Sequence, residues 1–352
     1  PPALWHGHEM LFGYVAAVVA GFLLTSVPAW SGAAPLQGWP LAALAALWLA
    51  GRLAMALPLG LPAWVIALVD CAFLPTVATW VGMALWRARK LKNMVFVAVL
   101  MGLAIVNLLS HWDQLQPGSQ LGYPALLMAV DGVALLIVIL GGRITPAFTA
   151  NALRMQGVQA TLRTYPWLER AAVGSVAALV AAQAAQLAWP GLAGLGAALA
   201  LLAAALNGLR LAGYQSRRTT HQPILWVLHV GYGWLVVGLA LQGLAPFWPA
   251  LPPTTALHAL TIGAMGTYPL GVMSRAALGH TGRPLVAPRL MAWAYGLISL
   301  AALLRLAAPL LWPEHYPWVI GASGVAWTLA FALFLGVYAP ILLRPRVDGQ
   351  PG

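Results

Sequence analysis

The chain has 352 residues, of which 61% are hydrophobic and only 7% are charged. A soluble protein of this length carries roughly a quarter charged residues, so a water-soluble globular fold is excluded. The net charge of +11 does not indicate nucleic-acid binding, because the basic residues lie in short gaps between apolar runs. The single cysteine, Cys71, excludes disulfides and thiolate zinc sites.

Eleven apolar runs have the length of about 20 residues that a membrane-spanning helix requires. They fall at residues 9–29, 39–58, 61–86, 93–110, 122–142, 168–189, 191–213, 223–244, 254–275, 289–311 and 317–342. The sequence therefore predicts an all-α polytopic integral membrane protein, a helical bundle that forms one domain over residues 1–352. The longest polar segment, about Arg143 to Pro166, is expected to hold a short surface helix.

The charges of the loops predict one orientation. Lys and Arg occupy every second loop and the C-terminal tail: Arg87, Arg89, Lys90, Lys92, Arg143, Arg154, Arg163, Arg217, Arg218, Arg275, Arg283, Arg289, Arg344 and Arg346. The alternate loops carry no Lys or Arg and hold Asp113 and Glu314. By the positive-inside rule, the basic loops and the C-terminus face the cytoplasm, as expected for a multi-pass protein of a bacterial inner membrane.

Ionisable side chains within the spans are candidates for function, because burying them in lipid is costly. Most of them fall in the predicted outer half or at its edge: His6, His8, Glu9, Arg52, Asp70, His111, Asp131, His258 and Arg305. His229 lies about two turns from the predicted inner face, and His280 lies in or near a cytoplasmic loop. This shared depth predicts a metal centre in the outer half, formed by His6, His8, His111 and His258.

The chemistry of these residue types supports that prediction. Neutral imidazole is a good ligand for copper, iron and zinc, and nearby carboxylates commonly orient ligating histidines. Arg52 and Arg305 are candidates to pair with haem propionates. No Cys-x-x-Cys-His occurs, so a haem would be bound non-covalently.

Structural interpretations stay open beside the functional one. Arg52 and Asp70 are also expected to form an ion pair within one buried polar network, with Asp131 or Arg305 as further candidate members. Asp131 is otherwise explained by a bond to a neighbouring helix. The pair His6-x-His8 is a weak signal, because helical residues two apart point to nearly opposite faces.

Several strings of the sequence together resemble the NnrS family. They are WHGHEMLFGYVAAVVAGFLLTSVPAW at Trp5 to Trp30, GGRITPAFTAN at Gly141 to Asn151, LWVLHVGYGWL at Leu225 to Leu235, and HALTIGAMGTYPLGVMSRAALGHTGRPL at His258 to Leu285. The resemblance implies about twelve spans, one of them preceding the first string and not seen in this chain. It also implies haem (b-type) and copper as cofactors and a link to denitrification and nitric oxide stress. The recurrent histidines of the family match His6, His8, His111, His229, His258 and His280.

The resulting hypothesis is a haem–copper protein that binds nitric oxide and reduces or detoxifies it in the periplasmic half of the bilayer. Glu9, Asp70 and Asp131 are the candidate proton carriers, and quinol is the candidate electron donor. His258 is expected to bind copper or haem, with His229 as a haem axial ligand and His280 as support for a loop or a haem propionate. Two other functions fit the same residues: a transporter or chaperone for copper or haem, and a non-catalytic nitric oxide sensor. Nitric oxide, membrane lipid and quinol are the expected partners, and nucleic acid is not one.

Overall fold

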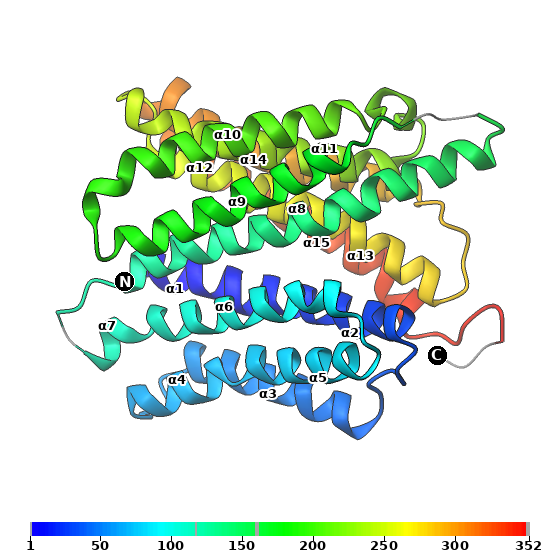
Figure 1. Cartoon of the computed structure of the whole chain (residues 1–352), viewed down its shortest axis with the longest axis horizontal. Coiled ribbons are helices and arrows are strands. Elements are labelled where there is room, and N and C mark those ends of the chain that lie inside the picture. The colour runs from blue at the N-terminus through cyan, green and yellow to red at the C-terminus, as the bar shows by residue number, and fades with distance from the viewer. Residues whose placement is uncertain (1, 117, 159–161, 350–352) are drawn as a thin grey trace. The chain divides into compact units, whose positions relative to one another are not determined.

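A computed structural model describes residues 2–116, 118–158 and 162–349. Helices make up most of these residues, and no strand occurs among them. Ten helices in the described ranges are long and apolar enough to cross a membrane (Figure 1). The prediction of a polytopic helical membrane protein is therefore confirmed. Contacts along the chain group the helices into two compact units, the first ending at Val133 and the second beginning at Ala134; a single domain stays a prediction.

The first unit contains the first four spans and the start of the fifth. Its helices are α1 (Pro2–His8), η1 (Glu9–Val15), α2 (Ala16–Ser31), α3 (Trp39–Ala56), α4 (Ala63–Cys71), α5 (Phe73–Arg87), η2 (Leu91–Met94), α6 (Val95–Ser110), α7 (Trp112–Leu115) and the start of α8 (Gly122–Met155). α3 packs on α4, and α5 packs on both α2 and α6. The long side chains of α3 are mostly exposed, as expected for a helix that faces lipid.

The second unit contains the rest of α8 and the spans that follow it. Its helices are α9 (Pro166–Gln186), η3 (Pro190–Leu192), α10 (Ala193–Ala212), η4 (Ser216–Thr219), α11 (Pro223–Leu244), η5 (Ala245–Phe247), α12 (Pro253–His258), η6 (Ala259–Gly266), α13 (Thr267–His280), α14 (Arg289–Leu311), η7 (Pro313–His315) and α15 (Tyr316–Leu342). α10 packs on α9 and α11, and α14 packs on α15. Several helices have proline in their first turn, where no backbone N–H is needed.

Two details differ from the expected spans. The polar segment after Arg143 does not form a separate surface helix, because α8 continues without a break to Met155. Its Ala, Leu and Met residues are good helix formers, and Pro146 sits inside the helix without ending it. The predicted span 254–275 is helical as α12, η6 and α13, yet it is not among the ten apolar spans.

Two π-helical segments occur among the described residues, one in each unit. η1 begins directly after His8, and η6 begins directly after His258. A π-helix is rare, and where it occurs inside an α-helix it often marks a functional site. Each segment therefore makes the histidine that precedes it a candidate functional residue.

Candidate metal centre in the first unit

Three buried side chains of the first unit bring possible ligand atoms together. His8 ends α1, Asp70 lies in α4, and His111 follows α6 directly. The Nε2 atoms of His8 and His111 lie 3.2 and 3.0 Å from Oδ2 of Asp70. One ligand atom from each residue lies within 4.8 Å of the other two. Three helices that are separate in sequence thus converge on one small volume.

A buried polar network surrounds this group. Arg52 donates from Nη1 to Glu9 Oε1 at 2.5 Å, and its Nη2 forms an ion pair with Asp70 Oδ1. Asn107 donates from Nδ2 to Asp70 Oδ2 at 2.8 Å. The predicted pairing of Arg52 with Asp70 is confirmed, and Glu9 and Asn107 are further members of the network.

Small residues let the charged side chains approach one another. A Cβ at Gly51 would lie 3.2 Å from the Cα of Asp70 and 3.3 Å from its Oδ1, so α3 can come this near to α4 only without a side chain there. A Cβ at Gly13 would lie 3.2 Å from Arg52 Nη1. The two glycines therefore make room for the Arg52–Asp70 pair at the helix surfaces.

The hydrogen-bond partners of His8 indicate that a positive charge would stabilise its site. Its Nδ1 lies 3.2 Å from Glu9 Oε1, and its Nε2 lies 2.9 Å from Asn107 Oδ1. Both partners are acceptors, because the amide nitrogen of Asn107 already faces Asp70. A neutral imidazole has a single N–H and can satisfy only one of them. The other ring nitrogen then turns its lone pair toward an oxygen, and a second proton or a metal cation at Nε2 would remove that repulsion.

The charges of the network also indicate that a cation would stabilise it. The carboxylates of Glu9 and Asp70 both contact the one guanidinium of Arg52, which leaves one negative charge over. Uncompensated charge in a buried site is costly, so one further cation stabilises the network. Two imidazole nitrogens and one carboxylate oxygen suit copper, iron or zinc. The donor set thus fits a transition-metal ion, and protonation of His8 is the competing way to supply the charge.

Two other predicted residues of the first unit lie apart from the ligand group. His6 is exposed whereas His8 is buried, because both lie in one continuous turn of α1 and face different sides. Asp131 is fully buried in α8. Neither supplies a ligand atom to the group of His8, Asp70 and His111.

The remaining predicted residues belong to the second unit. His229 is buried in α11, where Thr149 Oγ1 and Ser216 Oγ each lie 2.9 Å from one ring nitrogen. His258 is half-buried, and its Nδ1 lies 2.5 Å from the carbonyl oxygen of Thr254 one turn earlier. The other two are Arg305, half-buried in α14, and His280, exposed at the end of α13. Their cofactor roles stay predictions.

Sequence reasoning missed a second buried cluster, centred on Arg210 of α10. Its Nε and Nη2 both bond to the carboxylate of Glu169, the Nε bond being 3.0 Å long. Its Nη1 donates to the carbonyl oxygen of Val138 and to the hydroxyl of Tyr232, each at 2.9 Å. Tyr232 in turn donates to Asn207 at 2.5 Å. The signal for this cluster was the polar pair Asn207 and Arg210 one turn apart in an apolar span.

Sequence reasoning also missed Asn107 in the first unit. It lies in the apolar run of α6, four residues before His111, so both side chains lie on one face of the helix. An amide at this spacing from a buried histidine was a usable signal.

A comparison with protein families found one match, to the family model described as NnrS protein, which covers residues 1–346. A comparison with curated proteins found no match.

Proposed function

The chain belongs to the NnrS family, and on this premise we propose that it binds nitric oxide at a copper ion held by His8, His111 and Asp70. It reduces or detoxifies nitric oxide there, in the periplasmic half of the bacterial inner membrane. The observation that carries the proposal is the environment of His8, whose two ring nitrogens both face oxygen acceptors. A cation with nitrogen and oxygen ligands satisfies that environment and the excess negative charge together.

The protein residues have separate tasks in this function. Glu9 accepts the Nδ1 hydrogen of His8, so it orients the ring and directs Nε2 toward the ion. Arg52 holds both carboxylates in place. When bound, copper supplies a redox-active centre for a small neutral ligand. Nitric oxide is neutral and dissolves in lipid, so it reaches the site without a polar channel.

Proton supply falls to the carboxylates. The side chain of Glu9 keeps 19% of its surface exposed, whereas that of Asp70 is fully buried. Glu9 therefore takes up protons from outside and holds them beside the metal-ligand group, 3.2 Å from Nδ1 of His8. Asp131 is the third carboxylate in our proposal, and quinol is the proposed electron donor.

Haem is the second proposed cofactor, and its predicted ligands already have other hydrogen-bond or ion-pair partners. Both ring nitrogens of His229 are hydrogen-bonded to hydroxyl groups, so ligation through His229 requires Thr149 or Ser216 to release its bond. Arg52 is already paired with two carboxylates. These residues do not present a free haem site, so in our proposal Glu9, His8 and Arg52 act without haem.

Metal analysis of purified variants tests the function. We expect His8→Ala and His111→Ala to lose copper and nitric oxide consumption, whereas His229→Ala, a matched change of a buried histidine in the second unit, retains copper. Full copper and full activity in both first-unit variants would overturn the proposal. If the protein binds copper and moves it across the membrane but does not consume nitric oxide, a transporter would be favoured.

The proposed orientation has its own test. We propose that the basic loops lie in the cytoplasm, so a cysteine placed at Arg217 should be shielded from a membrane-impermeant thiol reagent in intact cells. A cysteine at Glu314 should react. Reaction at Arg217 would reverse the orientation and the periplasmic placement of the site.

A further inference from the structure

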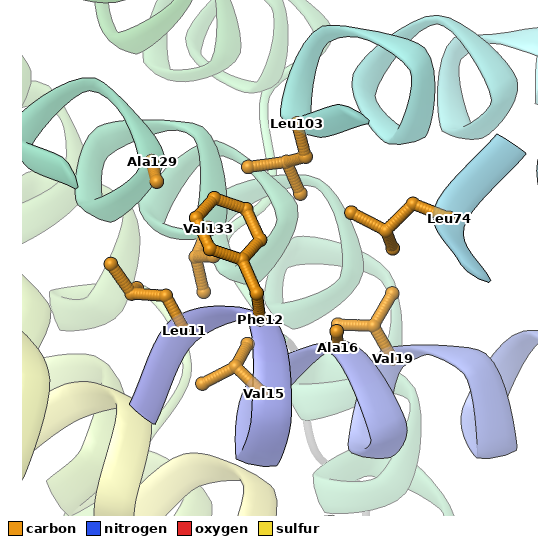
Figure 2. Close-up of a pocket in the computed structure, with 9 residues that line it drawn as sticks. All are labelled: Leu11, Phe12, Val15, Ala16, Val19, Leu74, Leu103, Ala129 and Val133. Atoms are coloured by element: carbon orange, nitrogen blue, oxygen red, sulfur yellow. The ribbon is translucent and has the colours of Figure 1, made fainter. Parts of the chain in front are cut away.

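A small apolar cavity lies in the first unit, beside the metal-ligand group. Its volume is about 10 Å³, and its lining is entirely apolar and includes Leu11, Phe12, Val15, Leu74, Leu103 and Ala129. Figure 2 shows Phe12 projecting from the helix of η1, with Leu74 and Leu103 facing it from other helices. A cavity of this size begins to admit one water-sized molecule, yet water needs polar partners and this lining offers none.

The helix register places the cavity one turn from the ligand group. Phe12 follows His8 by four residues, Leu74 follows Asp70 by four, and Leu103 precedes Asn107 by four. Side chains four apart in an α-helix lie on the same face, about 6 Å apart along the axis. In the predicted topology, each of these three four-residue spacings runs from the outer face of the membrane toward the cytoplasm. The aromatic ring of Phe12 also lies 5.0 Å from the imidazole of His8, centre to centre.

The local backbone supports a functional origin for the cavity. Leu11, Phe12 and Val15 all belong to the π-helical segment η1. Such a helix is rare and is frequently found at functional sites. Two of the other lining residues, Ala16 and Ala129, have small side chains that leave the space unfilled.

We propose that this cavity is the docking pocket for nitric oxide, the last position that the molecule occupies before it reaches His8 and Asp70. The inference rests on the proposed function and extends it to the substrate's path. A neutral diatomic molecule suits a dry, apolar space, whereas water and ions do not. The pocket thereby concentrates the substrate next to the polar network while keeping bulk water away from it.

Xenon is the probe for the cavity, because it binds in dry apolar cavities and requires no metal. Xenon is larger than water, so we expect it to bind to metal-free Leu103→Ala, whose cavity is enlarged, as measured by ¹²⁹Xe NMR against a protein-free detergent blank. Adding Ala129→Leu to this variant refills the space and should abolish the binding. Adding Ala46→Leu makes the same change on the lipid-exposed side of α3 and should leave it unchanged. The wild-type protein should bind xenon more weakly than Leu103→Ala.

Nitric oxide consumption by the copper-loaded protein completes the test. Ala129→Leu should raise the KM for nitric oxide about tenfold with little change in kcat, because the altered apolar pocket affects substrate access. Absence of xenon binding in the wild-type protein and in Leu103→Ala overturns the pocket. Xenon binding with an unchanged KM in Ala129→Leu overturns its role in docking. Failure of the proposed function is seen separately, as a protein that binds xenon but no copper.

Discussion

The buried polar clusters of the two units differ in their balance of charge. In the second unit, Arg210 faces a single carboxylate, Glu169, and its remaining bonds go to neutral oxygen atoms. In the first unit, Arg52 faces two carboxylates, and His8 lies between acceptors. A balanced cluster is complete without a ligand, whereas an unbalanced one is stabilised by an added cation. From this comparison we propose a structural role for the Arg210 cluster and a binding role for the Asp70 cluster.

The largest expected effect comes from breaking the balanced cluster. Arg210→Leu leaves Glu169 without its partner, so the free energy of unfolding should fall by about 3–5 kcal/mol. The double variant Arg210→Leu/Glu169→Leu should be less destabilised, because no unpaired charge remains. Thermal unfolding in detergent measures both. A copper content per folded protein that falls in the single variant would contradict a purely structural role.

Removing the excess negative charge of the first unit tests the same comparison. Glu9→Gln makes its cluster as balanced as that of Arg210 and weakens the orientation of His8. The affinity for copper should therefore fall about 10–100-fold, as measured by competition with a chelator. Glu169→Gln is the matched change in the second unit and should leave the affinity unchanged. Equal losses in the two variants would remove the distinction between the clusters.

A smaller effect is expected where α3 approaches α4. Gly51→Ala places a methyl group 3.2 Å from the Cα of Asp70, so the helices must separate slightly. Overpacking of this kind should cost about 1–3 kcal/mol of unfolding free energy and weaken copper binding. Gly21→Ala is the control, since nothing lies within 4 Å of its added Cβ. If the two variants unfold at the same temperature, the contact does not control the position of Asp70.

The smallest effect is expected at His6. Its side chain is exposed and lies outside the ligand group. His6→Ala should change the unfolding free energy by less than about 0.5 kcal/mol and leave copper content unchanged. His8→Ala, two residues away, should lose copper. Metal analysis of the pair would show whether one histidine or both of the His6-x-His8 pair serves the site.

The site was predictable in part. Shared depth and residue type pointed to His8, His111, Asp70 and Arg52, because ionisable groups within lipid have few structural explanations. The same reasoning included His6, since it uses sequence distance and cannot see which side of α1 packs inward. Asn107 escaped notice because a neutral amide in an apolar span carries no charge signal.

The sequence by itself determined the helical membrane fold and the position of most spans, and it predicted their direction and the depth of each polar residue. The thickness of the bilayer sets helix length, and the distribution of Lys and Arg predicts orientation, so both are local properties of the chain. Only the tertiary structure decided which residues of equal depth meet. Lateral contact depends on the rotation of each helix and on close approach at positions such as Gly51, which hydropathy does not record. For the same reason Arg210 and Glu169, 41 residues apart, were paired only by the packing of α9 on α10.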